Sequence, residues 1–225
     1  MIARVLLAVV LSGIAAGLVM GIIQHVRLTP LILQAETFEH VAHGHAVAAH
    51  AHGIEVWSPA NGAERTFYTA LTAIVTATGS AFLMAGVSII GNRPLNFANG
   101  PLWGLCGFFA VAFAPSLGLP PQLPGMAEAF LQQRQIWWVG TILSTALGLW
   151  ILTSGKTLRT VIPAMLLLFV PHMLWIPKTA TEVTPVPASL AAQFVTASLG
   201  ANLIMWCVLG ISLGFYLERS NRNVD

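Results

Sequence analysis

The chain has 225 residues and a formal net charge of +2, and 8% of its residues are charged, against about 25% in a typical soluble protein. Its mean hydropathy is +0.77. A water-soluble fold could not cover its surface with so few charges. The chain also has no run of basic residues that would indicate a nucleic-acid partner. The whole chain, residues 1–225, is therefore predicted to be a single integral membrane domain in a lipid bilayer.

Six apolar stretches predict an all-α polytopic membrane protein with about six transmembrane helices. A bilayer core of about 30 Å takes roughly 20 helical residues, and a helix satisfies its own backbone hydrogen bonds in lipid. The fifth stretch contains Pro163 and Pro171. If it does not cross the bilayer, five crossings remain and the C-terminus changes sides. The expected spans are about residues 5–24, 66–90, 97–119, 135–154, 158–177 and 190–217.

The first stretch carries glycines at four-residue spacing, namely Gly13, Gly17 and Gly21. Small residues at this spacing let two membrane helices approach closely. The contact is either inside one subunit or between two subunits. Because no small-residue cleavage site follows the stretch, we expect a retained helix rather than a signal peptide.

Lysine and arginine residues indicate the orientation, because short cytoplasmic loops carry an excess of them. With a cytoplasmic N-terminus in the bacterial inner membrane, six of these residues face the cytoplasm and four face the outside. The six are Arg4, Arg93, Lys156, Arg159, Arg219 and Arg222, and the four are Arg27, Arg65, Arg134 and Lys178. The clustered histidines fall on the second side. We therefore expect a histidine-rich extracytoplasmic loop over about residues 25–65.

Five of the seven histidines lie in the stretch EHVAHGHAVAAHAHG. Imidazole is the commonest metal ligand, and histidine-rich tracts are typical of metal binding. A helix over PLILQAETFEHVAHGH would place Glu36, His40 and His43 on one face, at i, i+4 and i+7. Cobalt, nickel, copper and zinc all suit imidazole and carboxylate ligands, and a solvated loop without metal is the alternative. The predicted ligands in this loop are Glu36, Glu39, His40, His43, His45, His50 and His52.

His172 lies near the outer end of the fifth stretch, in VPHMLWIP. It either hydrogen-bonds a neighbouring helix or holds the metal at a second station, because an ionisable group at membrane depth is a functional candidate. A second polar pattern follows helical spacing in the second stretch and is expected to face the bundle interior. Its members are Thr69, Thr72, Thr76 and Ser80. No Asp or Glu lies deep in any span, which weighs against an ion pump.

Five stretches also match one known pattern together. They are PLILQAETFEHVAHGHAVAAHAHG, VWSPANGAERTFYT, LGLPPQLPGMAEAFLQQRQIWW, VPHMLWIP and PASLAAQFVTASLGANLIMW. This set resembles the CbtA family of probable cobalt transporter subunits, over about residues 30–206. The resemblance implies cobalt uptake for cobalamin synthesis and a small single-span partner with histidines of its own. The family pattern after the Pro-His pair usually runs Gly-Ala-Pro, whereas Leu174, Trp175, Ile176 and Pro177 follow Met173 here.

The residues and the resemblance together predict a carrier rather than an enzyme. It captures divalent cobalt at the outer loop and passes it inward, and ATP is not bound by this chain. A rival hypothesis is an accessory or structural subunit of a larger membrane complex, whose loop buffers or delivers metal. A membrane metalloenzyme is the third, and it would need a more compact ligand set than this loop, with its Gly and Ala residues between the histidines.

Overall fold

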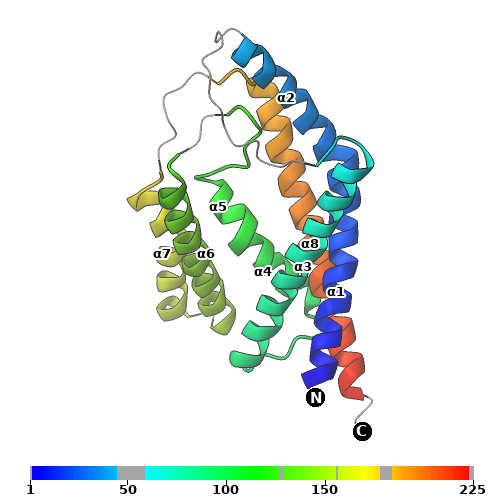
Figure 1. Ribbon diagram of the computed structural model, residues 1–225. Helices are drawn as coiled ribbons and strands as arrows, with labels where there is room; N and C mark the ends of the chain where they lie inside the picture. Colours follow the sequence, from blue (N-terminus) through cyan, green and yellow to red (C-terminus); the bar gives the residue numbers. More distant parts are fainter. Residues whose placement is uncertain (1, 45–58, 127–128, 156, 178–183, 223–225) are drawn as a thin grey trace.

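The computed structural model describes residues 2–44, 59–126, 129–155, 157–177 and 184–222. These residues form helices and no strands, so the all-α prediction is confirmed (Figure 1). Two of the helices are π-helices, labelled η. The elements are α1 (Ile2–Ile23), η1 (Gln24–Leu28), α2 (Thr29–Gly44), α3 (Ala63–Ile90), α4 (Gly100–Phe108), η2 (Phe109–Phe113), α5 (Ala114–Ser116), α6 (Leu131–Ser154), α7 (Leu158–Leu174) and α8 (Ala188–Arg222).

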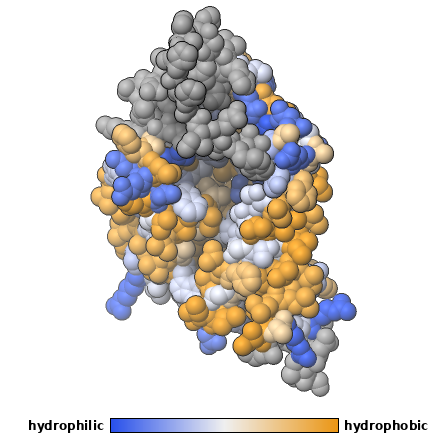
Figure 2. Space-filling model, viewed as in Figure 1, coloured by the Kyte–Doolittle hydropathy of each residue, from blue (hydrophilic) through white to orange (hydrophobic). Residues whose placement is uncertain are grey.

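Each of the six expected stretches contains a helix. Four of the helices are long and apolar enough to cross a membrane, and they cover Ile2–Phe38, Ala63–Ile90, Leu131–Ser154 and Ala188–Ser220. The third and fifth stretches give shorter apolar helices, Gly100–Ser116 and Leu158–Leu174. Figure 2 shows hydrophobic residues over the middle of the molecule and hydrophilic residues toward its two ends. This arrangement fits a polytopic membrane protein.

The glycines of α1 pack against α3 inside the same subunit. A Cβ atom added at Gly13 would lie 2.5 Å from the Cα of Thr78, and one added at Gly17 would lie 2.8 Å from the backbone nitrogen of Ile74. These separations are too short for any side chain, so the two backbones touch. The glycines therefore make the first of the two expected contacts, the one inside a single subunit.

A second close crossing joins α4 to α8. A Cβ atom added at Gly210 would lie 2.8 Å from the nitrogen of Gly104 and 3.0 Å from its Cα. Close backbone approach replaces the hydrophobic effect as a source of helix affinity in lipid, because lipid tails are as apolar as leucine. Leu209 and Leu213 are fully buried beside this crossing. Helices α1, α3, α4 and α8 thus form one bundle (Figure 1).

Helices α6 and α7 form a hairpin at the side of this bundle (Figure 1). They pack on each other at Gly148, where a Cβ atom would lie 3.0 Å from the carbonyl oxygen of Ala164. The hairpin contacts the α4–η2–α5 segment through edge-to-face rings of Trp103 and Trp150, with centroids 6.4 Å apart.

Both ends of the described chain lie at the same end of the molecule, opposite the far end of α2 (Figure 1). The Arg4 guanidinium donates a 3.4 Å hydrogen bond to the carbonyl of Ser220. Near the same end, Arg93 lies 4.0 Å from the ring centroid of Trp150 and donates to Thr153 at 2.8 Å. An even number of crossings would produce this placement of the termini.

Candidate functional site

Helix α2 and the first turn of α3 are joined by an ion pair. Arg65 donates to the two carboxylate oxygens of Glu36 at 2.5 Å and 3.3 Å, and to the side-chain oxygen of Asn61 at 2.8 Å. Both partners of the ion pair are partly exposed, so the pair contributes modestly to stability. Its main effect is positional, because it holds together the two helices that flank residues 45–58.

Glu36 is also a predicted metal ligand, and both of its carboxylate oxygens accept hydrogen bonds from Arg65. A metal ion at this carboxylate would have to compete with the guanidinium. The role of Glu36 as a ligand therefore stays a prediction, now with a named competitor.

The histidine positions of α2 follow the expected helix. The α-helical backbone runs from Thr29 to Gly44, so positions 36, 40 and 43 have the predicted i, i+4, i+7 spacing. The side chains of Glu39, His40 and His43 lie outside the described part of the chain, as do residues His45, His50 and His52. Within the described residues, no group of three or more His, Cys, Asp or Glu side chains could hold a metal ion. The metal-ligand set remains a prediction.

A polar recess lies beside the ion pair, at the junction of η1 and α3. It has a volume of about 320 Å³ and is lined by Gln24, Pro59, Arg65, Tyr68, Thr69 and Thr72. His25 lies next to it, with Nδ1 3.3 Å from the hydroxyl of Thr66. The side-chain oxygen of Gln24 is buried and has no hydrogen-bond partner among the described residues. Nothing in the sequence indicates this recess, because Gln24 and His25 belong to no motif.

The hydroxyl stripe of α3 does not face the bundle interior, and that expectation was wrong. Thr72 and Thr76 are exposed, and the hydroxyl of Ser80 bonds within its own helix to the carbonyl of Thr76 at 3.0 Å. The neighbouring face, with Ala73 and Ala77, packs on α1 instead. The physical reason is the α1 glycines, which let the two backbones approach at Ile74 and Thr78.

His172 lies near the end of α7 against Trp137 of α6, with ring centroids 5.7 Å apart at an angle of 71°. The indole Nε1 of Trp137 donates to the carbonyl of Pro171 at 3.3 Å. His172 Nδ1 is buried and has no hydrogen-bond partner among the residues that the structure describes. Two roles were expected for His172. The first, a hydrogen bond to a neighbouring helix, is not formed by Nδ1 among the described residues, and the second, a metal station, stays a prediction.

Helix α7 continues through both of its prolines. Pro171 has no N–H, so the carbonyl of Leu167 loses its helical donor. The hydroxyl of Ser144 on α6 replaces that donor at 2.6 Å. The buried face of α6 carries two further hydroxyls, because its buried residues are Trp137, Thr141, Thr145 and Gly148. Their helical spacing is the sequence signal for this face.

A family profile described as "Probable cobalt transporter subunit (CbtA)" matches residues 2–218, nearly the whole chain. The chain belongs to the CbtA family. Comparison with curated proteins and with solved structures gave no match.

Membership of the CbtA family supports a broad function class. The family is described as a probable cobalt transporter subunit, so cobalt transport is supported at the family level. The word subunit implies a partner chain. The apolar helices imply a lipid bilayer around the protein. The resemblance over residues 30–206 thus extends toward both ends of the chain.

Proposed function

We propose that this chain takes up divalent cobalt across the bacterial inner membrane, as one subunit with a small single-span partner that carries histidines of its own. The family match over residues 2–218 carries this proposal. The cobalt serves cobalamin synthesis in this proposal, and the metal is a substrate rather than a resident cofactor. Nickel, copper and zinc are competing ions for the same ligands.

Capture takes place in this proposal at Glu36, Glu39, His40, His43, His45, His50 and His52. The geometry of α1, η1 and α2 supports this location. The three elements follow one another without a loop, and the stretch Ile2–Phe38, which contains an apolar window long enough to cross a membrane, covers 37 residues. At 1.5 Å per residue such a helix is about 55 Å long, against about 30 Å for a bilayer core. A helix that enters the bilayer near its first residues would therefore carry positions 40 and 43 beyond the bilayer core.

We propose a cytoplasmic N-terminus and six crossings, with the histidine-rich segment outside. The Arg4–Ser220 hydrogen bond supports an even number of crossings. The excess of lysine and arginine in the segments on the side of the termini supports the orientation. His172 is in this proposal a second station for the ion, near the outer end of α7.

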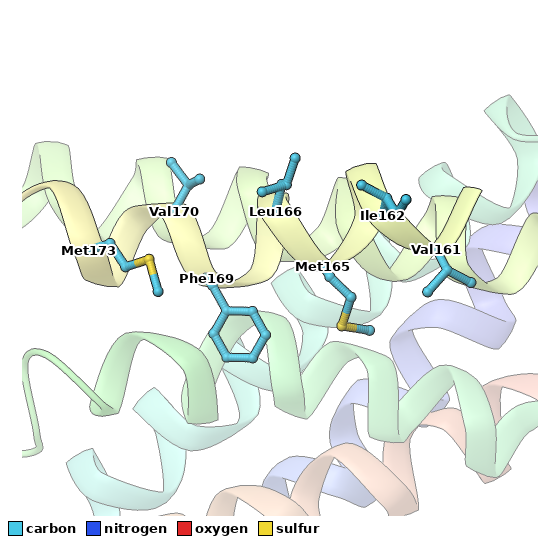
Figure 3. Close-up of a pocket in the computed structure, with 7 residues that line it drawn as sticks. All are labelled: Val161, Ile162, Met165, Leu166, Phe169, Val170 and Met173. Carbon is cyan, nitrogen blue, oxygen red and sulfur yellow. The ribbon is translucent and has the colours of Figure 1, made fainter. Parts of the chain in front are cut away.

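A second candidate function is that of an accessory or structural subunit in a larger membrane complex, with the loop buffering or delivering metal. The apolar face of α7 favours it (Figure 3). A shallow groove of about 310 Å³ follows this helix, and Phe169 and Met173 are 56% and 80% exposed. Such a face suits a neighbouring helix as well as lipid. The groove is lined by Val161, Ile162, Met165, Leu166, Phe169, Val170 and Met173.

The deciding experiment is uptake of radioactive cobalt by cells that express the chain alone or with its partner. The loop variant replaces His40, His43, His45, His50 and His52 by alanine. At low external cobalt we expect its uptake to fall by about tenfold or more, the scale on which lost metal-site groups act. Replacement of the exposed Gln132 and Gln133 by alanine is the control. Uptake equal to that of empty cells, with and without the partner, would overturn the transport function and favour the accessory-subunit function.

A further inference from the structure

Hydroxyl groups inside the apolar helices mostly bond back to their own helix. Ser12 donates to the carbonyl of Ala8 at 2.7 Å, and Thr78 donates to that of Ile74 at 2.8 Å. The same i to i−4 bond occurs in α8, where Ser212 donates to the carbonyl of Val208 at 2.7 Å. This arrangement removes a free donor from an environment without water.

Two threonines of α6 depart from this pattern. Thr141 is 0% exposed and Thr145 is 2% exposed, and neither Oγ1 atom has a hydrogen-bond partner among the described residues. They lie four residues apart and therefore share one face of the helix. An unpaired buried hydroxyl is unfavourable, and native proteins satisfy such groups with protein atoms or ordered water. Two on one face indicate a common occupant.

The surroundings show where this face lies. One turn toward the outer end, Trp137 contacts His172 and the position of Gly118, which follows α5. Toward the other end, Gly148 packs on Ala164 of α7. Thr141 and Thr145 lie between these contacts along α6, so their face packs on α7, below the point where Trp137 reaches the residue that follows α5. The π-helix η2 also contacts α6, and π-helical turns are frequent at functional sites.

His172 contributes a third unpaired atom at the outer end of the same face, because its Nδ1 is buried without a partner among the described residues. Its ring lies against Trp137, one helical turn from Thr141. Two hydroxyl oxygens and an imidazole nitrogen can each exchange hydrogen bonds with water. All three groups are neutral when the imidazole is unprotonated, and no carboxylate of α6 or α7 competes with them, because neither helix contains one.

We propose that Thr141, Thr145 and His172 line a hydrated seam between α6 and α7. In this proposal a divalent cation passes the seam with its bound water, and this part of the inference rests on the proposed transport function. Neutral groups bind the coordinated water of such an ion by hydrogen bonds and release it again. Conduction needs this balance, since binding must let the ion enter and also leave.

Chemical accessibility of introduced cysteines tests for the water. The full chain is used in native membranes. Its two cysteines are first removed by Cys106→Ala and Cys207→Ala, and then Thr141→Cys or Thr145→Cys is introduced. The controls are Leu143→Cys and Leu147→Cys, whose side chains are 64% and 51% exposed on the outside of the same helix. The probe is an ethylammonium methanethiosulfonate, which reacts with a thiolate and therefore needs water at the thiol.

In a hydrated seam the cysteines at positions 141 and 145 react faster than the two controls by at least about tenfold, the order by which water access changes thiolate formation. Reaction no faster than at the lipid-facing controls would overturn the seam. This result does not depend on cobalt transport, so it separates failure of the seam from failure of the proposed function.

Uptake of radioactive cobalt tests passage of the ion. The double variant Thr141→Val and Thr145→Val keeps the side-chain shape and removes both hydroxyls, and we expect the uptake rate at saturating cobalt to fall by about tenfold. Thr196→Val is the matched control, because that threonine is exposed and bonds to the carbonyl of Ala192. Wild-type uptake by a correctly folded double variant would overturn passage through the seam. Thermal unfolding of the purified variants establishes that they are folded.

Discussion

The hydroxyl of Ser144 on α6 donates a 2.6 Å hydrogen bond to the carbonyl of Leu167 on α7, the carbonyl that Pro171 leaves without a helical donor. One helix thus repairs a defect that proline creates in the other. Ser144→Ala should lower the free energy of unfolding by about 1–2 kcal/mol, because a buried carbonyl then lacks a donor. Thermal unfolding in detergent measures this loss.

The control for Ser144→Ala is Ser80→Ala. Among the described residues, the Ser80 hydroxyl bonds only to the carbonyl of Thr76 in its own helix, so its loss should change stability by no more than about 0.5 kcal/mol. Equal effects of the two substitutions would show that the Ser144–Leu167 bond does not stabilise the hairpin.

The glycine contact between α1 and α3 makes a second prediction. In Gly17→Ala the new methyl group would meet the backbone of Ile74, and overpacking of this kind costs about 1–3 kcal/mol. In Gly79→Ala no described atom lies within 4 Å of the new methyl group. Here the stability should stay constant or rise by about 0.5–1 kcal/mol, because alanine is the better helix former. A loss of stability in both variants would argue against the close crossing.

The Glu36–Arg65 pair makes a third prediction, about affinity for cobalt. If Glu36 is a ligand, Arg65→Gln removes its competitor and should strengthen cobalt binding a few-fold, because an exposed pair is worth about 1 kcal/mol or less. Glu36→Gln should weaken binding. Isothermal titration of the purified protein with cobalt measures both effects. Binding unchanged by Glu36→Gln would show that this carboxylate only anchors α2 to α3.

The fourth prediction separates capture of the ion from its passage. His172→Ala should lower the maximal rate of cobalt uptake and leave the half-saturating cobalt concentration unchanged, because in the proposed function His172 acts after capture. The five-histidine loop variant should do the reverse. His25→Ala is the matched histidine control, since His25 lies outside both groups and contacts Thr66. A rise in the half-saturating concentration with His172→Ala would place His172 in the capture step instead.

Composition and hydropathy were sufficient to predict the helices, because a bilayer permits few other backbone structures. The six stretches follow from length and apolar content alone, and the helix that carries positions 36, 40 and 43 follows from the sequence after Pro30. The first helix also showed its contact face, since glycines at four-residue spacing have few other uses in a membrane helix.

Helix faces were harder to predict. In lipid, an apolar side chain gives no sign of whether it faces the bundle or the bilayer. Hydroxyls at helical spacing, such as those of Thr72 and Thr76, predict an interior face, whereas Ala73 and Ala77 on the neighbouring face of α3 are the residues that pack there. The buried hydroxyls Thr141 and Thr145 were missed for the same reason. Their role depends on which helices lie opposite, and the sequence of α6 does not contain that information.

The contact between Arg4 and Ser220 has a consequence for how the protein can be rebuilt. The two ends of the described chain are close together, so a short linker could join them, and the connection between α6 and α7 offers new ends for a circular permutant. Such a chain would keep the helix contacts described above but insert its helices in a different order. The order of insertion and the final packing could thus be varied independently in this protein.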